Sequence, residues 1–563
     1  MTLDRRRALA LVGLGAAAPA AACAGTTAAR APVRFLHGVA SGDPLQDRVV
    51  LWTRVTPEGG DKPVRVSCEL REAGSDKVAA RWKGVTGPDR DYTVKIDMAG
   101  LKPATEYAFV FKAAGATSPV GRTRTLPEAD VNSAVLAVVS CSLHPGGLFN
   151  VYDAVARLER VDAVVHLGDY IYEYGAAANA YGMQNGLKLG RIPEPAHETV
   201  SLDDYRRRHA QYKTDPDLQA AHARAPWICV FDDHEVTNDP WRDGAENHDK
   251  DEGDWGARKA AALKAYFEWM PIREPKAVDH SAVARSFRFA DVASLHMIET
   301  RLTARSKQLD YDTDLKTVTG PDGKPVPDLP SLYKALNAPS RELMGLEQLA
   351  WLGRELAASV RGGVAWQLIG SQIVTARTPG PDIAKAIGTD RLAAAFAQMS
   401  EGRRRRLQQT AALFATGAPM NLDAWDGYPA ERERLYEVFK TAGARPVVLS
   451  GDSHSFWANE LHDASGRRVA VEFGTSAVSS PPTSLSTAIP GLDVGQVIAA
   501  QAPEVVHCDM GPRGYVLLTL TRDEAKAEFL GVSTILEKPY QVLPLKTFRA
   551  RPEGAGVSGL ETI

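Results

Sequence analysis

Potential metal ligands follow four apolar segments of the chain. The most compact case is the run His166-Leu167-Gly168-Asp169-Tyr170-Ile171-Tyr172-Glu173, which follows the apolar residues 161–165. That segment is short and rich in β-branched residues, so it predicts a buried strand. Gly168 allows the backbone to turn, which places the Asp169 carboxylate at the strand's carboxyl end, where α/β proteins usually bind ligands. Tyr172 is spaced to reach the same point.

Three further stretches have the same form, a predicted strand followed by side chains that bind metals. They are Ser140-Cys141-Ser142, Asp232-Asp233-His234-Glu235 and Gly451-Asp452-Ser453-His454. Carboxylate oxygens favour calcium or magnesium, whereas thiolate, phenolate and imidazole favour a transition metal. A mixed set at one edge of a sheet therefore predicts two or more unlike metals that share a carboxylate.

Each of these residues has an ordinary structural explanation when it is taken alone. An isolated Gly-Asp pair is commonly a turn or a helix cap, a lone cysteine a small buried hydrophobe, and a lone tyrosine a half-buried aromatic. Consecutive charges directly after an apolar strand, as in Asp232 to Glu235, need a partner. Because the four sets occur in order at successive strand ends, the ordinary explanations fail jointly.

The elements that position these side chains are strands and helices that alternate after residue 127. Residues 134–139 and 161–167 predict strands on either side of a helix at 151–158, and this β-α-β unit implies a parallel sheet. Residues 175–195 and 307–332 lack periodicity and predict a loop and an insertion. The further predicted elements are strands at 228–231, 293–298, 366–369 and 447–449, and helices at 257–269, 345–357 and 430–441.

Before residue 127 the pattern is one of short alternating strands separated by Gly, Pro and Asp, which predicts an antiparallel sandwich. Residues 101–107 resemble the corner of fibronectin type III domains, where a tyrosine fixes the start of a strand. We therefore expect an all-β fibronectin III or Ig-like sandwich at 33–127. An α/β domain at 133–545 and a C-terminal tail at 546–563 would follow it.

The composition limits the partners of the chain. Its 563 residues carry 66 basic and 69 acidic side chains, a near balance that makes nucleic acid an unexpected partner. Arg403 to Arg406 form a run of charge that predicts a solvated helix face. The cysteines are scattered and indicate no disulfide framework. Cys229, inside an apolar run, is expected to be a core residue.

The first thirty residues predict an export signal. Arg5, Arg6 and Arg7 precede an alanine-rich apolar stretch that ends in small residues and is too short for a membrane span. The arginines resemble a twin-arginine signal, so we expect export of the folded chain by the twin-arginine translocation machinery to a periplasmic or other extracytoplasmic location. Cys23 is a weak match to a lipoprotein processing site.

The order and spacing of the four sets resemble the calcineurin-like metallophosphoesterases, whose motifs are D-x-H, G-D, G-N-H-E/D and G-H-x-H. Cys141 stands where the first Asp would be, Asp233 replaces the Asn, and Asp452 replaces the first His of the last motif. With these three replacements the chain resembles the PhoD-like alkaline phosphatases, which the same departures distinguish. Residues 35–44, 50–54 and 449–458 also resemble that family, so the similarity covers nearly the whole mature chain.

This resemblance implies a metal-dependent hydrolase of phosphate esters with an α/β metallophosphoesterase domain. A ferric ion would bind Cys141, Asp169, Tyr172 and His454, and calcium would bind Asp233, Asp452 and the shared Asp169. Asp232 would hold calcium directly or through water. Thiolate and phenolate are anionic donors that suit Fe(III), but geometry decides between iron, manganese and zinc at such sites.

The expected reaction is attack on phosphorus by a metal-activated hydroxide. His234 would stabilise charge or protonate the leaving oxygen. Arg301 would bind phosphate as a fork, and Asn238 is expected to contact substrate beside it. The motifs bind phosphate rather than the leaving group, so they do not distinguish monoester from diester substrates. A phospholipase D-type or teichoic-acid-type diesterase is the alternative activity, and a non-catalytic surface binding protein the alternative class. We expect a monomer.

The assignment of Tyr172 makes a prediction about colour. If its phenolate binds Fe(III), the protein should absorb visible light by charge transfer, and Tyr172→Phe should bleach it. An absorption spectrum of the purified protein tests this. A colourless wild type that is fully loaded with iron would contradict the assignment.

Overall fold

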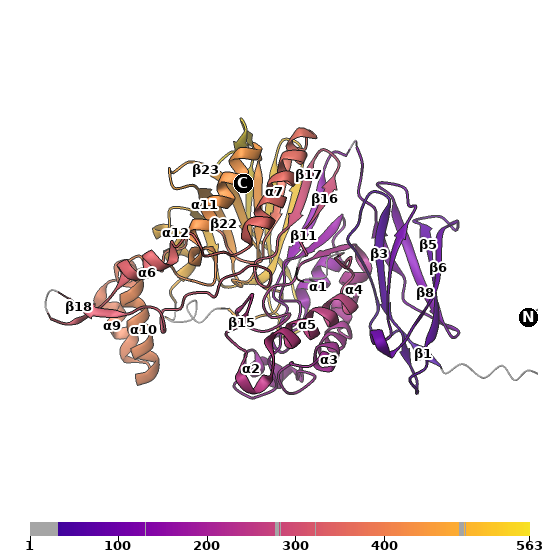
Figure 1. The fold of residues 1–563 in the computed structure, drawn as a ribbon, viewed down its shortest axis with the longest axis horizontal. Coiled ribbons are helices and arrows are strands. Elements are labelled where there is room, and N and C mark those ends of the chain that lie inside the picture. The colour runs from indigo at the N-terminus through magenta and orange to yellow at the C-terminus, as the bar shows by residue number, and fades with distance from the viewer. Residues whose placement is uncertain are drawn as a thin grey trace, which may run out of the picture.

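The computed structural model describes residues 32–129, 131–275, 281, 283–320, 323–482, 489 and 491–563. The predicted export signal and Cys23 lie outside these residues. Figure 1 shows an all-β region at one side of an α/β body, with an arm of short helices on the other side. None of the helices in the described ranges is both long and apolar enough to span a bilayer.

The all-β region is a sandwich of two layers. Buried side chains of both layers, among them Leu51, Val94, Phe109 and Phe111, form one core. At its corner the Tyr107 hydroxyl accepts a hydrogen bond from the Lys102 N–H at 2.8 Å. One layer contains β5 (Val64–Glu72), β6 (Val78–Thr86), β8 (Glu106–Ala113), β9 (Ala116–Thr117) and β10 (Gly121–Arg124), and the other contains β2 (Val39–Gly42), β3 (Arg48–Arg54) and β7 (Thr93–Ala99).

The second layer of the sandwich also belongs to the α/β body. Strand β2 pairs in parallel with β13 (Trp227–Cys229) at Gly42 and Trp227, so a ten-stranded sheet runs through both regions. The approach is close, because a Cβ on Gly42 would lie 2.2 Å from the Pro271 carbonyl oxygen. The predicted division between residues 127 and 133 therefore separates two regions that share a sheet.

The rest of this first sheet carries three of the four ligand sets. Its parallel part is β11 (Ala134–Val139), β12 (Ala163–His166) and β13, as the β-α-β pattern predicts.

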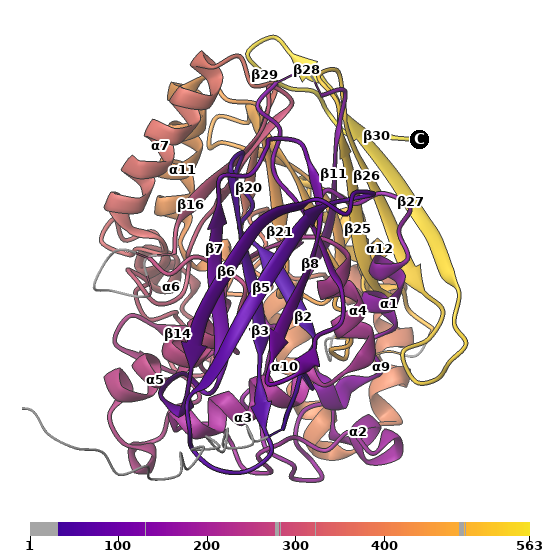
Figure 2. The ribbon, with the colours of Figure 1, turned by 90° about the vertical axis from the view of Figure 1, so that its right-hand side faces the viewer.

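The predicted tail at 546–563 is wrong, because Phe548 and Ala550 are buried in the core and residue 545 lies inside a strand. The antiparallel edge, yellow in Figure 2, contains β25 (Arg513–Leu520), β26 (Ala525–Val532), β27 (Val542–Ala550) and β30 (Glu561–Thr562).

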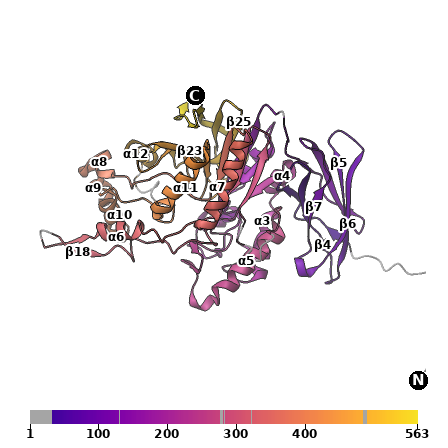
Figure 3. The same ribbon diagram turned by 45° about the horizontal axis from the view of Figure 1, so that its top comes forward.

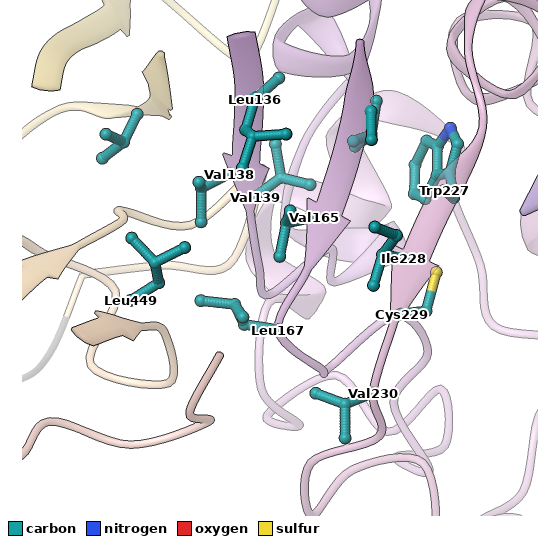
Figure 4. Packing of buried hydrophobic residues seen from close by; sticks show 14 of the residues in the cluster. Leu136, Val138, Val139, Val165, Leu167, Trp227, Ile228, Cys229, Val230 and Leu449 are labelled. Atoms are coloured by element: carbon teal, nitrogen blue, oxygen red, sulfur yellow. The ribbon is translucent and has the colours of Figure 1, made fainter. Parts of the chain in front are cut away.

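A second sheet packs face to face against the first. Leu136 and Val138 of β11 share a core with Leu449 of the second sheet (Figure 4). Leu368 of the second sheet belongs to the same core. Cys229 lies in this core, as predicted. The second sheet has the order β16 (Arg285–Phe289), β17 (Ala293–Met297), β20 (Trp366–Gly370), β21 (Pro446–Ser450), β23 (Arg468–Gly474), β22 (Phe456–His462) and β24 (Val505–Asp509).

Helices cover the outer faces of the two sheets (Figures 1 and 3). The central strands are buried on both sides and are therefore apolar on both faces: in β21 Val447 packs between the sheets and Val448 packs under the helices. Beside the first sheet lie α1 (Asn150–Ala156), α3 (Leu202–Lys213), α4 (Pro216–Arg224) and α5 (Trp255–Trp269). Beside the second lie α7 (Gly345–Arg361), α11 (Pro429–Ala442) and α12 (Val494–Gln501).

Two predicted irregular stretches contain structure. Residues 175–195 include α2 (Met183–Leu189), which lies between two left-handed glycines and buries too few side chains to give a periodic pattern. Arg403 to Arg406 lie in the first half of α10 (Glu401–Phe414) and are largely exposed, which confirms the solvated helix face. The arm and the insertion at 307–332 supply β18 (Thr317–Thr319), β19 (Pro325–Pro327), α6 (Leu329–Leu336), α8 (Ile383–Ile387), α9 (Thr389–Ala397) and α10 (Glu401–Phe414). The remaining short strands are β1 (Val33–Arg34), β4 (Thr56–Pro57), β14 (Pro240–Trp241), β15 (Gly244–Ala245), β28 (Pro552–Glu553) and β29 (Gly556–Val557).

Candidate metal centre

The four predicted ligand sets meet where β11, β12, β13 and β21 end. Ligand atoms of Cys141, Asp169 and His454 lie within 4.8 Å of one another. A second group, in which Asp169 is joined by Asp232, Asp233 and Asp452, is equally compact. Asp169 belongs to both groups, so one carboxylate lies between a set of mixed donors and a set of oxygen donors.

The backbone is strained where these side chains begin. Cys141, Asp169, Asp452 and His454 all have left-handed conformations, with φ between 54° and 61°. Each such residue costs about 1–2 kcal/mol when it is not glycine. The surrounding sheet must therefore hold them in place, which is typical of functional sites. The turn re-aims each ligand from its strand toward the common centre.

On the mixed-donor side, Tyr172 and His454 face the same point. The Tyr172 hydroxyl donates to Asp169 Oδ2 at 2.9 Å and lies 3.4 Å from His454 Nε2. His454 Nδ1 lies 2.9 Å from the Pro481 carbonyl oxygen, to which it can only donate, and this leaves the Nε2 lone pair for a metal. The donor set of thiol, phenol, imidazole and carboxylate fits a transition metal.

On the oxygen side, buried carboxylate atoms lack hydrogen-bond partners. Within the described residues, Asp232 Oδ2 and Asp233 Oδ1 are buried and accept no hydrogen bond. Asp233 Oδ1 lies 3.5 Å from Arg301 Nη2, which is an ion pair without a hydrogen bond. A buried acceptor without a hydrogen bond is costly, and a cation that takes only oxygen ligands would satisfy both atoms. The Asp232, Asp233 and Asp452 donor set therefore fits calcium.

Burial and neighbouring carboxylates raise the pKa values of several proposed ligands. Burial, followed by the neighbouring Asp233 carboxylate, raises the pKa of Asp169 well above its usual range. Burial likewise raises the pKa of Asp452 to about 6, although Arg301 opposes the shift. Burial and the Asp169 carboxylate raise the pKa values of Cys141 and Tyr172. Bound cations would reverse these shifts, because positive charge stabilises every one of the ionised forms.

His234 lies beside the cluster and is held by Glu173. Its Nδ1 lies 2.7 Å from Glu173 Oε2, and its Nε2 lies 3.8 Å from Asp233 Oδ2. Burial alone would lower the pKa of His234, but the Asp233 and Glu173 carboxylates outweigh it and raise the pKa well above its usual value. Glu173 is fixed in turn by the Asn238 N–H at 2.9 Å and the Asn247 side-chain amide at 3.0 Å.

The two predicted substrate residues have different surroundings. Arg301 is fully buried, donates to Asp232, and lies 3.4 Å from Asp452 Oδ1, so carboxylates occupy its N–H groups. Its role as a phosphate fork stays a prediction. Asn238 is half-buried at the edge of the cluster, where its side chain donates to Glu246 at 3.1 Å and accepts from Tyr174 at 3.3 Å.

Sequence reasoning did not assign roles to several residues that support the ligands. Glu235 accepts hydrogen bonds from the backbone N–H groups of Asp169, Tyr170 and Asp232 at 3.0, 2.6 and 2.8 Å, and so fastens the end of β12 to that of β13. The position of Glu235 in the run of charged residues after β13 could have indicated this role from the sequence. Ser480, which donates to the Tyr172 hydroxyl at 2.7 Å, has no comparable sequence signal.

The chain is similar to known proteins over most of its length. Residues 136–529 match the family described as PhoD-like phosphatase, and residues 19–127 match its N-terminal domain. The chain belongs to the PhoD-like phosphatase family. It is 34% identical to alkaline phosphatase D of Bacillus subtilis (strain 168) over 510 residues, which cover 88% of this chain and 77% of that protein. The solved structure of PhoD superposes with a TM-score of 0.74 at 29% identity and covers 94% of this chain and 92% of that one.

The predicted family is thus confirmed, together with an α/β PhoD-type fold that carries an N-terminal all-β region. The family match spans the ends of β11, β12, β13 and β21, so the whole ligand cluster of this PhoD-like phosphatase lies inside it.

Gly168 is predicted to be essential to the cluster. Its φ is +109°, and a Cβ there would lie 2.3 Å from the Asp232 Cβ. We expect Gly168→Ala to displace the Asp232 backbone and abolish tight metal binding. Gly190→Ala is the matched control: Gly190 also has a left-handed φ (+68°) but open space around it, so it should cost only about 1–2 kcal/mol and keep the metals. Elemental analysis and thermal unfolding of both variants test this, and equal metal content would contradict it.

Proposed function

We propose that this PhoD-like phosphatase, a hydrolase of phosphoric esters by its family, works with a ferric ion and calcium that share Asp169. The observation that carries the proposal is the pair of overlapping ligand groups, one with thiol, phenol and imidazole donors and one with oxygen donors alone. Cys141, Tyr172 and His454 would hold iron, and Asp232, Asp233 and Asp452 would hold calcium. Two unsatisfied carboxylate oxygens support the calcium assignment.

When bound, the metals supply Lewis acidity that withdraws charge from the phosphoryl oxygens and activates the attacking water. The protein contributes a rigid frame for this chemistry. The left-handed ligands and the three backbone hydrogen bonds to Glu235 hold the donors before substrate arrives, so little reorganisation is needed. Arg301, between Asp232 and Asp452, offsets part of the negative charge on the calcium side.

His234 is the proposed general acid. The Glu173 carboxylate binds its Nδ1 and favours the protonated ring, which leaves the Nε2–H on the side of the cluster to be given to the leaving oxygen. Proton transfer matters most when the leaving group is a poor one. A stable anion such as an aryl oxide can leave without a proton, whereas an alkoxide is a poor leaving group and needs one.

The proposal also covers the export of the chain, the classification of its two regions and its substrate. We propose export of the chain by a twin-arginine signal in residues 1–30 to an extracytoplasmic location. We also place the α/β domain among the calcineurin-like metallophosphoesterases and the all-β region among fibronectin III-like sandwiches. The Tyr107 corner supports the last assignment. The physiological substrate is a phosphate ester, and the ligand groups recognise its phosphoryl part.

The activity is tested with the metal-loaded protein on an aryl phosphate, a bis-aryl phosphate and an alkyl phosphate. The two aryl substrates rank monoesterase against diesterase activity. Absence of turnover on all three would contradict the proposed function.

His234→Asn tests the general acid in the same assay. We expect its turnover of the alkyl phosphate to fall about 10²- to 10⁴-fold, with a much smaller loss on the aryl phosphate. His296→Asn is the control, because His296 is buried in β17 and, among the described residues, hydrogen-bonds only to Ser286 and Ser294. An equal loss by His234→Asn on both substrates would show that His234 does not protonate the leaving group.

A further inference from the structure

Arg513, the first residue of β25, is a buried cation beside the proposed iron ligands. Its side chain donates to the backbone carbonyl oxygens of Ser480 at 2.7 Å and His454 at 3.0 Å. Two more hydrogen bonds go to the carbonyl oxygens of Met510 and Gly511, and Nε has no partner among the described residues. The residue is only 5% exposed. All four of these hydrogen bonds are thus to backbone carbonyls.

No carboxylate of the described residues forms an ion pair with Arg513, although Asp509 is near enough to favour its charged form. Burying a guanidinium without a directly paired carboxylate is expensive. Two other buried arginines pair with a carboxylate, Arg285 with Asp43 and Arg432 with Asp426. Arg208 resembles Arg513, because its side chain donates to backbone carbonyl oxygens such as that of Pro195. Burial lowers the pKa of Arg513 to about 10, and the neighbouring Tyr181, Cys141 and Asp509 oppose the shift. The proposed thiolate of Cys141 and phenolate of Tyr172 would supply the missing negative charge.

Hydrogen bonds connect Arg513 to these ligands through one residue. The Ser480 hydroxyl donates to the Tyr172 hydroxyl at 2.7 Å and to the Cys141 carbonyl oxygen at 3.0 Å. Ser476 adds a second link, because its hydroxyl lies 3.1 Å from the His454 carbonyl oxygen and 2.7 Å from that of Pro512. The start of β25 thus holds the backbone at His454 and Ser480 together.

We propose that Arg513 is a positioning residue of the iron half of the centre, which fixes His454 and Ser480 and balances the charge of the Cys141 and Tyr172 ligands. The inference rests on the proposed function, because it takes those residues as iron ligands. It gives the two halves different counter-charges, with Arg301 among the calcium carboxylates and Arg513 behind the thiolate and phenolate.

The test compares three variants of the metal-loaded enzyme. Arg513→Met removes the charge and the hydrogen bonds, while Arg513→Lys keeps the charge. Arg522→Met removes an exposed arginine at the other end of β25, which pairs with Asp291 at 2.7 Å. The readouts are iron and calcium affinity, the visible absorption band and the reduction potential of the iron.

We expect Arg513→Met to weaken iron binding about 10- to 100-fold, the usual effect of losing an outer-shell partner, with a much smaller change for calcium. The iron that remains should have a lower reduction potential, because a nearby positive charge favours the reduced ion. Arg513→Lys should keep a potential close to that of the wild type, and Arg522→Met should match the wild type in every readout.

Equal potentials in wild type and Arg513→Met, or an equal fall in Arg513→Lys, would overturn the charge-balancing role. If Arg513→Met retains no iron, the metal affinities of Arg513→Lys decide. Iron and calcium affinities that fall equally in Arg513→Lys, relative to the wild type, would show general unfolding and overturn the inference. These results differ from failure of the proposed function, for which the wild type itself would be active without iron.

Discussion

Four carboxylates at the site lie close enough to repel one another strongly. Asp169, Asp232, Asp233 and Asp452 place their ligand atoms within 4.8 Å of one another, and at such distances like charges in a poorly solvated site cannot all stay ionised without cations. Arg301 compensates part of the charge but leaves two carboxylate oxygens without a hydrogen bond. Bound cations would relieve this repulsion, which is consistent with the metal site that we propose.

The carboxylates and the other proposed ligands come together because strands of two sheets end at the same place. The first sheet contributes Cys141, Asp169 and Asp233, and the second contributes Asp452 and His454. Packing of the two sheets through Leu136, Leu368 and Leu449 fixes their relative position. The favourable burial of this core must offset both the left-handed ligand conformations and the repulsion at the site.

Much of the site could be predicted because its ligands have local signals. Asp169 and Asp233 each follow an apolar strand directly, and parallel strands end at the same edge. Ser480 and Arg513 could not be found in this way, because Ser480 contacts Tyr172 from 308 positions away and its neighbours form no periodic pattern. The predicted tail at 546–563 failed for a related reason. Strand β27 is exposed on alternate residues, and its partner β26 is recognisable only in three dimensions.

Metal analysis of Asp169→Asn tests most directly whether one carboxylate holds two unlike metals. The account predicts iron and calcium in the natively produced wild type and the loss of both from Asp169→Asn. Cys141→Ala, measured beside it, should lose iron and keep calcium. Retention of either metal at wild-type affinity by Asp169→Asn would contradict the shared ligand.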